Sequence, residues 1–378
     1  MTIPAAEGPD SSPPIRRLTL GLLSSHNPYD RSSFSGTAYF AAKALENNTS
    51  IDLKILGPHR PLTLLSRVLK RVLRKENDPI DPLKLSLEGV DAVVGLVASD
   101  LLDQLLPQLH VPVFHVTDAT PMFLREFYDW DIPQAADATE KRVAEGAASV
   151  IYSSHYMAER ASEDLGKTIS TAVAPFGVNF DDLPRTKPAK APYSPLNLLF
   201  VCSEWKRKGG DIVIAILKWL QDQDIPVNLV VAGHVPQEFQ DHPGLTYVGF
   251  LNKNTARGMS QLIDLYKTSH IFLLPSRGDC TPMVVAEAMA HGTPVLASDT
   301  GGMATLINPG SGQIMPIDAS IEDWGKSILD ITSDPNRFEK MSDRAFDHAT
   351  KNLTWDAWAQ TVADLCARAV TQGPKSNL

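Results

Sequence analysis

Apolar runs that read as β-strands alternate with helical patterns along this chain, and this alternation limits the folds that it can adopt. In the first half the strand-like runs are residues 18–23, 51–56, 92–97, 111–116, 149–152 and 171–175, and in the second half 196–202, 227–232, 246–248, 271–274 and 295–297. Strands that are separated by helices form parallel sheets, because a parallel return needs a crossover connection. The sequence therefore predicts an α/β fold with parallel sheets.

The length of the chain predicts two domains. A chain of 378 residues exceeds one ordinary hydrophobic core, and two domains of about 190 residues each would accommodate it. Residues 183–195 hold four prolines and no periodic apolar pattern, as expected of a linker between domains. We predict a disordered tail (1–14), an N-terminal domain (15–185), a C-terminal domain (186–354) and a closing helix with its tail (355–378), with the last helical patterns at 321–331, 335–351 and 355–369.

Composition excludes several classes of protein. A net charge of −9 does not favour nucleic-acid binding driven by bulk charge. Cys202, Cys280 and Cys366 lack metal-ligand spacing and are odd in number, which is typical of a reducing compartment. The polar start of the chain lacks the apolar core of a signal peptide, and no run reaches the roughly 18 apolar residues of a membrane span. These features predict a cytoplasmic protein.

Residues 271–302 contain the densest group of chemically useful side chains. An apolar strand leads into a loop with Gly278, a helix opens with Pro282 near its first position, and a second strand ends at a Gly-Gly turn. The N–H groups of residues 278–283 are expected to be exposed at the helix start, where unpaired donors attract anions and hydroxyl oxygens. Asp279 and Glu287 lie eight residues apart, so their carboxylates can meet different ends of one extended ligand.

These residues resemble the nucleotide-sugar signature of glycosyltransferase family 4. The family pattern P-S-x-x-E, E-A-x-A-x-G-x-P-V and G-G is matched by residues 275–279, 287–295 and 301–302, with Asp279 where the family usually has Glu. The resemblance implies the GT-B fold, in which two Rossmann-like domains with parallel sheets face a central cleft. It also implies that the C-terminal helix crosses back to the N-terminal domain.

The resemblance assigns roles within this segment. Glu287 would hold the ribose hydroxyls of a nucleotide sugar, and Asp279 would fix sugar hydroxyls as a catalytic residue. The neighbouring residues expected to bind the donor are Gly278, Cys280, Thr281, Pro282 and Met283.

A basic loop at residues 203–210, SEWKRKGG, follows the first strand of the second half. It matches the family loop that ends in Lys-Gly, so Lys208 would contact the donor diphosphate and stabilise the leaving group. The family commonly has an arginine where this chain has Ser203. Either Arg207 or Lys206 replaces that guanidinium, or diphosphate binding is weaker. A solvated basic turn is the alternative reading of the same residues.

Two further positions resemble the family's nucleotide site. The turn around Gly233 follows a buried strand and resembles a turn near the base and diphosphate, and the adjacent His234 is either part of that site or an exposed loop residue. Near Phe250 the family holds the base through backbone groups. Because backbone contacts leave no side-chain signature, uracil, guanine and adenine remain equal candidates.

In the N-terminal half, the resemblance points to the loop after the first strand. Ser35, Gly36 and Thr37 would contact the acceptor and phosphate, although a simple capping turn with Ser35 as N-cap explains the same residues. Asp118 stands near the place where many family members have a catalytic His. The nearby His115 lies within a predicted strand, and we interpret it as a core residue.

Asp129, Trp130 and Asp131 spell D-x-D, the metal motif of a different transferase fold. Because the motif lacks the strand context of that fold, we interpret it as a coincidence. We expect no metal and no other cofactor, since lysine, arginine and helix N–H groups can assist the departure of the diphosphate.

The sequence thus predicts a retaining glycosyltransferase that moves a hexose from a UDP- or GDP-sugar to an alcohol acceptor, such as a glycan or a lipid-linked saccharide. A catalytically idle sugar-nucleotide-binding regulatory protein is one alternative, because the family pattern is broken at Ser203, Asp279 and Asp118. A nucleotide-sugar epimerase, which also uses Rossmann-like domains, is the other.

Residues 60–75 hold six basic residues and no acid within an acidic chain. Read as a helix, the segment places an apolar stripe opposite a basic face. Such a helix could lie on an anionic membrane and present a lipid-linked acceptor. Alternatively the stripe packs on the N-terminal sheet and the basic face is solvated.

Replacing Arg67, Lys70, Arg71 and Arg74 together by Gln tests the membrane interpretation. We expect the variant to lose sedimentation with anionic liposomes, because the attraction between basic side chains and acidic headgroups is removed. Neutral liposomes are the control. A variant that still sediments with anionic liposomes as the unchanged protein does would contradict this interpretation.

Overall fold

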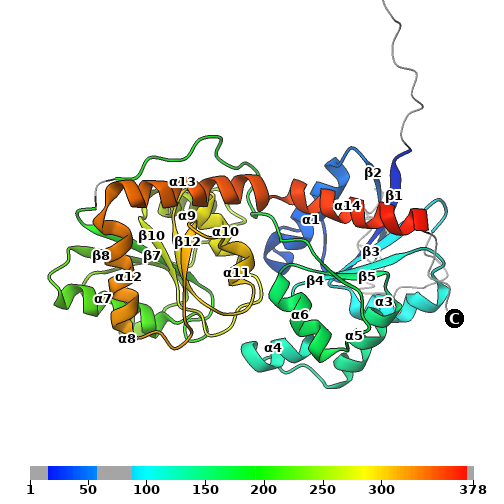
Figure 1. Cartoon of the computed structure of the whole chain (residues 1–378), viewed down its shortest axis with the longest axis horizontal. Coiled ribbons are helices and arrows are strands. Elements are labelled where there is room, and N and C mark those ends of the chain that lie inside the picture. The colour runs from blue at the N-terminus through cyan, green and yellow to red at the C-terminus, as the bar shows by residue number, and fades with distance from the viewer. Residues whose placement is uncertain (1–15, 58–86, 192, 373–378) are drawn as a thin grey trace, which may run out of the picture.

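The computed structural model describes residues 16–57, 87–191 and 193–372, and within them the chain forms two parallel sheets of six strands each. The strand orders are β2-β1-β3-β4-β5-β6 and β12-β11-β10-β7-β8-β9, and every pairing is parallel. The two sheets belong to two halves that lie side by side (Figure 1). The predicted α/β fold with two parallel sheets is confirmed. The basic segment 60–75 lies outside the described residues.

The elements of the first half alternate between strand and helix. Its strands are β1 (Leu18–Ser24), β2 (Ile51–Gly57), β3 (Ala92–Leu96), β4 (Val113–Thr117), β5 (Ser149–Tyr152) and β6 (Thr171–Val173). Its helices are η1 (Ser33–Gly36), α1 (Thr37–Asn47), α3 (Ser99–Leu105), η3 (Leu106–Gln108), α4 (Pro121–Tyr128), α5 (Ala135–Gly146) and α6 (His155–Asp164). These strands begin within two residues of the predicted positions, because each is a short apolar run between polar turns.

The second half repeats the alternation. Its strands are β7 (Leu196–Cys202), β8 (Val227–Gly233), β9 (Leu245–Gly249), β10 (Ile271–Leu274), β11 (Val295–Ser298) and β12 (Gly312–Met315). Its helices are α7 (Gly210–Asp222), α8 (Gln237–Gln240), α9 (Ala256–Thr268), α10 (Met283–Met289), α11 (Met303–Leu306), α12 (Ile321–Ser333) and α13 (Pro335–Asn352), and α14 (Trp355–Gln372) follows. The sequence did not predict β12. It is a four-residue edge strand, largely half-buried, and so carries no long apolar run.

Helix α14 joins the C-terminal end of the chain to the N-terminal sheet. Its buried side chains Trp358, Val362 and Cys366 share a hydrophobic cluster with residues of α1, β1 and β3, including Ala41 and Leu22. Figure 1 shows α13 running along the second half and α14 continuing across the first. The helix therefore crosses back as predicted, and burial of its apolar face fixes it there.

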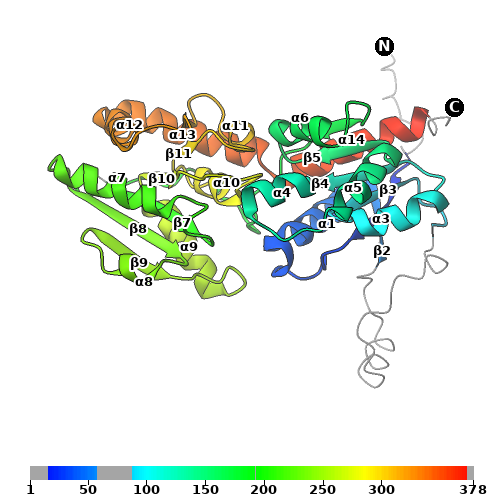
Figure 2. The same ribbon diagram turned by 90° about the horizontal axis from the view of Figure 1, so that it is seen from below.

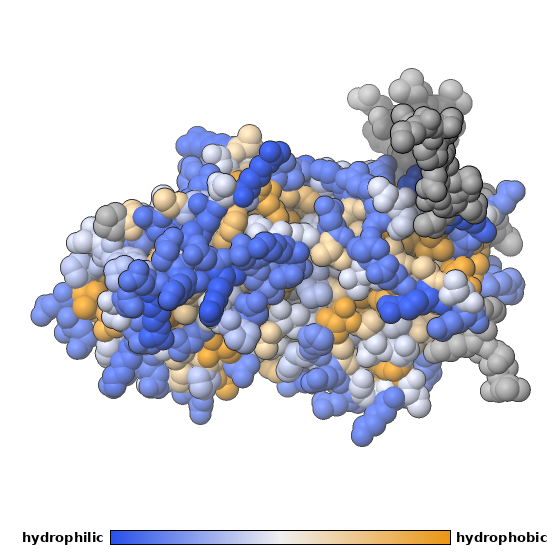
Figure 3. Space-filling model, turned by 45° about the horizontal axis from the view of Figure 1, so that its top comes forward, coloured by the Kyte–Doolittle hydropathy of each residue, from blue (hydrophilic) through white to orange (hydrophobic). Residues whose placement is uncertain are grey.

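The surface that carries these last helices is polar. On the face drawn in Figure 3, hydrophilic side chains predominate and hydrophobic ones are scattered in small groups. Among the described residues, no helix combines the length and apolar character needed to cross a membrane.

A polar group is buried on the far side of the N-terminal sheet, where α3 and α5 pack. His115 is fully buried, and its Nε2 lies 3.1 Å from Glu140 Oε1 and 3.2 Å from Ser99 Oγ. Ser99 Oγ donates to Glu140 Oε2 at 2.5 Å. Burial alone would raise the pKa of Glu140, but the charge and hydrogen bonds of His115 and the bond from Ser99 outweigh burial and lower that pKa. His115 is therefore a packed core residue of the N-terminal domain, as interpreted from the sequence.

Replacing Glu140 by Gln should destabilise the protein at neutral pH. Because the folded-state pKa of Glu140 is lowered, its stabilisation is present above the unfolded-state pKa of about 4.5 and is lost as the pH falls through the folded-state pKa. We expect the free energy of unfolding at pH 7 to be about 1–3 kcal/mol lower in the variant than in the unchanged protein. This difference should shrink as the pH falls below ~4.5. Urea unfolding of both proteins at pH 7 and at a pH below ~4.5 measures this difference.

The control is Glu145→Gln on the same helix, where an exposed carboxylate pairs with Lys141 at 4.0 Å. We expect little change in that variant, because exposed pairs contribute little. If Glu140→Gln lowered the free energy of unfolding by the same amount at neutral and at acid pH, the assigned pKa shift of Glu140 would be contradicted.

Candidate functional site

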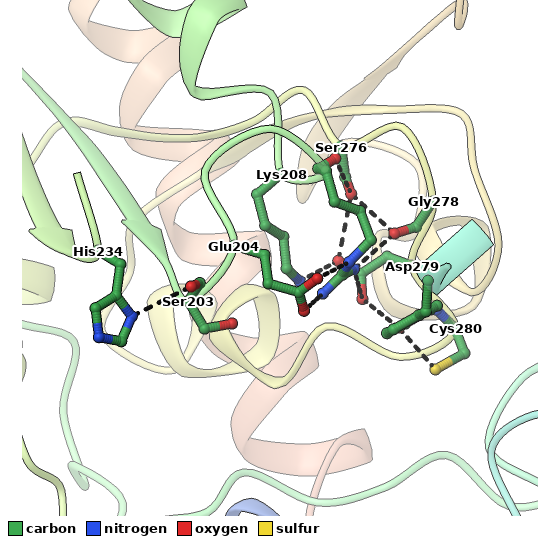
Figure 4. A network of polar contacts seen from close by, with 10 residues as sticks. Ser203, Glu204, Lys208, His234, Ser276, Gly278, Asp279 and Cys280 are labelled. Atoms are coloured by element: carbon green, nitrogen blue, oxygen red, sulfur yellow. Dashed lines mark hydrogen bonds and ion pairs between the residues drawn. The ribbon is translucent and has the colours of Figure 1, made fainter. Parts of the chain in front are cut away.

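Two loops of the second half meet at the C-terminal ends of neighbouring strands. Residues 203–209 follow β7 and residues 275–282 follow β10, and these two strands pair directly. The Arg277 N–H donates to the Arg207 carbonyl at 2.8 Å, and Ser276 Oγ donates to the same carbonyl at 3.3 Å. Ligands of open parallel sheets bind at this edge. The two segments singled out from the sequence therefore form one structural unit (Figure 4).

Two glycines allow this close approach. Gly209 has a φ of +81°, and a Cβ at that position would lie 2.0 Å from the Pro275 carbonyl oxygen. Gly301 has a φ of +52°, and its Cβ would lie 1.7 Å from the Asp279 carbonyl oxygen. Both positions combine a left-handed backbone with a contact that only glycine permits. The Lys-Gly and Gly-Gly motifs thus hold the loop around Asp279 in place.

Lys208 and Asp279 form a buried ion pair between the two loops. Lys208 Nζ contacts Asp279 Oδ2, and both side chains are at most 10% exposed. Figure 4 shows the two side chains pointing toward one another across the site. Such a pair is stable only when its charges are also satisfied by hydrogen bonds, and the Ser276 hydroxyl, at 3.5 Å from the same Asp279 oxygen, adds one contact.

Arg207 stands beside this pair. Its guanidinium donates to the Gly278 carbonyl at 2.8 Å and to Glu204 at 3.1 and 2.5 Å, and lies 3.8 Å from Asp279. The side chain of Lys206 is exposed. Of the two candidates for the missing family arginine, Arg207 is thus the one that the structure places at the site.

The N-terminal domain covers the predicted donor loop. Gly278, Asp279, Cys280 and Thr281 are buried, which corrects the expectation that their N–H groups are exposed. The Cys280 N–H donates to the Tyr128 hydroxyl at 3.2 Å. The hydroxyls of Ser153 and Thr281 lie 2.5 Å apart, and Pro282 is the N-cap of α10 rather than its first helical residue. The buried N–H of Cys280 therefore already has a partner from the opposite domain.

Asp118 lies in the same contact zone. The Cys280 thiol donates to Asp118 Oδ2 at 3.4 Å. Burial raises the pKa of Asp118, and the negative charge of Asp279 adds to this effect, although the bond from Cys280 opposes it. Burial likewise raises the pKa of the Cys280 thiol. The structure thus brings all three predicted catalytic residues, Asp118, Lys208 and Asp279, to one interdomain site.

Glu287 is fully buried one helical turn inside α10. Its Oε1 contacts Lys253 Nζ, and its Oε2 accepts a hydrogen bond of 2.9 Å from the Tyr266 hydroxyl. Burial, followed by the charge of Glu287, raises the pKa of Tyr266 far above its usual value, so the hydroxyl stays a donor. The side chain of Lys253 is 30% exposed. A ligand can therefore reach the Glu287 carboxylate only if Lys253 shifts.

The predicted base region carries an exposed aromatic pair. Phe250 is 63% exposed, and its ring stacks on His234 with centroids 5.3 Å apart. The imidazole Nδ1 of His234 lies 3.2 Å from the Ser203 carbonyl oxygen. The backbone N–H of His234 donates to the Cys202 carbonyl at 3.1 Å. These contacts join the turn at Gly233 to the basic loop (Figure 4).

The predicted acceptor loop has a left-handed backbone. Ser35 and Gly36 have φ values of +55° and +88°, and the N-cap of α1 is Gly36. The alternative with Ser35 as N-cap is therefore wrong, because a left-handed Ser35 cannot cap this helix from the position before Gly36. Thr37 is buried as the first residue of α1. Met283 of the donor loop packs against the cluster that contains Ala38.

Several residues of the site carried no signal in the sequence. Tyr128 ends a short helix, Ser153 follows a strand and Lys253 lies in a loop, and only the fold brings them to the donor segment. Asp129 and Trp130 follow Tyr128 directly, with Asp129 in a left-handed C-cap at φ +53°. Within the described ranges, no three side chains of the kinds that ligate metals gather in one place.

Comparison with known proteins finds a family match for the half of the chain that carries the two loops. Residues 195–334 match the family model described as glycosyl transferases group 1. The D-inositol 3-phosphate glycosyltransferases of Corynebacterium kroppenstedtii and Rhodococcus jostii are 30% identical to this chain over 118 and 96 residues, which is 31% and 25% of the chain. These matches cover 26% and 21% of the two relatives, so the chain spans about a quarter of the length of the curated relatives it matches.

Solved structures match over nearly the whole chain. A sucrose-phosphate synthase from Thermosynechococcus elongatus superposes with a TM-score of 0.68 at 17% identity, covering 94% of this chain and 100% of that one. HepE from Anabaena, in complex with UDP, gives a TM-score of 0.63 at 14% identity, covering 93% and 100%. At this level of identity the likeness concerns the fold.

Two Rossmann-like domains with a motif-bearing site between them define the GT-B class, and this chain has that fold. The chain as a whole has the GT-B fold, and its residues 195–334 match the glycosyl transferases group 1 family model. The resemblance seen in the sequence motifs is confirmed.

Replacing Gly209 by Ala should disrupt the junction of the two loops. The matched control is Gly249→Ala, because Gly249 has a similar φ of +78° and a Cβ there would meet no atom of the described residues within 4 Å. Left-handed strain alone costs about 1–2 kcal/mol, so we expect the Gly209 variant to lose clearly more stability than the control in urea unfolding. Equal losses in the two variants would show that contact with the Pro275 carbonyl is unimportant.

Proposed function

We propose that the protein is a retaining glycosyltransferase that transfers a hexose from a UDP- or GDP-sugar to an alcohol acceptor such as a glycan or lipid-linked saccharide. The observation that carries this proposal is the buried Lys208–Asp279 pair, with Arg207 beside it, at the strand ends of a group 1 domain. Two cations and a carboxylate at one interdomain edge suit a ligand that joins a diphosphate to a sugar. Anabaena HepE, which has a similar fold, was solved in complex with UDP, and this supports a uridine donor.

In the proposed reaction, the bond between the sugar C1 and the β-phosphate oxygen breaks. A bond forms between C1 and the acceptor oxygen, and the acceptor proton passes to the leaving diphosphate. Lys208 and Arg207 would exchange their present carboxylate and carbonyl partners for diphosphate oxygens and so stabilise the charge that develops there. Attack from the same face as the departing phosphate retains the configuration at C1, and no carboxylate is assigned as a covalent nucleophile.

Glu287 and the aromatic pair are proposed to hold the nucleoside. The ribose hydroxyls would donate to Glu287 once Lys253 moves aside, and a charged hydrogen bond of this kind is worth roughly 1.5–3 kcal/mol. Phe250 is exposed enough to contact a base. Because lysine and arginine supply the positive charge, the reaction is proposed to need neither a metal nor another cofactor.

A thermal-shift panel of UDP, GDP, ADP and their common sugar conjugates identifies the donor, because a ligand that binds only the folded state raises Tm. The identified donor then serves to measure acceptor-dependent release of nucleoside diphosphate, with EDTA present and absent. Binding without any release across an acceptor panel would favour the idle regulatory protein. No shift with any nucleotide would contradict the proposal.

Replacing Lys208 by Gln should lower kcat by about 10²–10³-fold, since a positioned group that stabilises developing charge has typically this effect. Lys206→Gln is the matched control, because its side chain is exposed two residues earlier in the same loop. We expect the control to retain nearly full activity. If loss of Lys206 impaired release as much as loss of Lys208, the assignment of the diphosphate contact would be wrong.

A further inference from the structure

Tyr128 reaches from the N-terminal domain into the donor loop of the C-terminal domain. It is the last residue of α4, which lies at the boundary between the halves (Figure 2). Its hydroxyl accepts from the Cys280 N–H at 3.2 Å and donates to Asp279 Oδ1 at 3.1 Å, and it lies 3.0 Å from Cys280 Sγ. The hydroxyl thus contacts Asp279, which the sequence motif predicts to fix sugar hydroxyls, and Cys280, which it predicts to bind the donor.

The hydrogen-bonding pattern of this hydroxyl is informative. The Cys280 N–H is only a donor and the Asp279 carboxylate only an acceptor, so a group that satisfies both must itself accept and donate. A hydroxyl does this, whereas an ionised phosphate has no proton to donate to Asp279. Burial, followed by the negative charge of Asp279, raises the pKa of Tyr128 well above its usual value, so the phenol keeps its proton. The position is therefore suited to an alcohol and not to a phosphate oxygen.

Both domains hold the Tyr128 ring. The Arg207 guanidinium lies 3.9 Å from the ring centroid. Within the N-terminal domain, the ring contacts Phe123 and Trp130, with centroids 6.2 and 5.4 Å away. A cation over the ring and aromatic neighbours at its edge fix an otherwise mobile side chain. The hydroxyl therefore occupies its position without further ordering.

We propose that Tyr128 occupies the sugar position of the donor site and competes with the donor, because its hydroxyl stands where one hydroxyl of the donor sugar binds. This inference rests on the proposed function. A donor enters only by displacing Tyr128, and its sugar regains the lost free energy only if it offers a hydroxyl with the same donor and acceptor geometry. Tyr128 thereby competes with any donor sugar for Asp279 and Cys280, and it leaves binding of the sugar-free nucleotide unaffected.

Isothermal titration calorimetry with UDP and UDP-glucose, or with the base and sugar that the thermal-shift panel selects, tests this role. In Tyr128→Phe the ring remains and the competing hydroxyl is gone. We expect the sugar nucleotide to bind about tenfold tighter, as loss of one competing charged hydrogen bond implies, and the sugar-free diphosphate to bind within about twofold of the unchanged protein.

The matched control is Tyr156→Phe. Tyr156 belongs to the same aromatic group, with its ring 6.0 Å from Phe123, but its side chain is partly exposed on α6. We expect it to bind both ligands as the unchanged protein does. Unchanged or weaker binding of the sugar nucleotide to Tyr128→Phe, with diphosphate binding intact, would overturn the role of Tyr128 alone. Failure of the unchanged protein to bind any nucleotide would overturn the proposed function as well.

Hydrogen exchange of the unchanged protein gives a test without any variant. Displacement of Tyr128 frees the end of α4, so the sugar nucleotide should raise amide exchange over residues 121–130, whereas the sugar-free diphosphate should not. Equal exchange of this segment with both ligands would overturn the proposal, even if the Tyr128 variant failed to fold.

Discussion

The arrangement of the site depends on the buried ion pair between Lys208 and Asp279. Removing charges from water costs several kcal/mol per ion, which the pair recovers only through close contact and additional hydrogen bonds. Lys208 follows β7 and Asp279 follows β10, so the pair joins the loops of two neighbouring strands. Replacing either partner alone leaves a buried charge without its nearest counterion, so the pair links the two loops.

The whole site is satisfied by partners from within the protein. Lys208 is paired with Asp279, Arg207 with Glu204, and Glu287 with Lys253 and Tyr266, while Tyr128 accepts the Cys280 N–H. A nucleotide sugar would therefore bind by exchanging partners and not by entering an open pocket. The exchanged groups come from both domains, so side chains of both domains would change partners when the donor binds. In the proposed reaction, affinity for the donor then depends on how much stronger the contacts with the donor are than the internal contacts that they replace.

Much of the fold was readable from the sequence, because it rests on local patterns. Short apolar runs between helical segments indicated the parallel strands, whereas the crossing of α14 back to the N-terminal sheet was expected only from the family resemblance. The strand β12 was missed, since four largely half-buried residues carry no periodic pattern. In the site, the motifs around Lys208, Asp279 and Glu287 were visible because they lie in contiguous segments. Tyr128 was not, since its contact with Cys280 joins residues 152 positions apart and depends on how the domains meet.

The departure from the family pattern at Asp279 is explained by the same contacts. A Glu at this position would extend its carboxylate by one carbon–carbon bond, about 1.5 Å, toward the space that Lys208 Nζ and the Tyr128 hydroxyl now fill. With Tyr128 at 3.1 Å from Asp279 Oδ1, that extension would force the phenol away or bend the longer side chain aside. The shorter aspartate and the inserted tyrosine therefore fit one another. The residue that departs from the motif and the residue that no motif predicted are two parts of one arrangement, in which a phenol hydroxyl satisfies a carboxylate at the boundary of the domains.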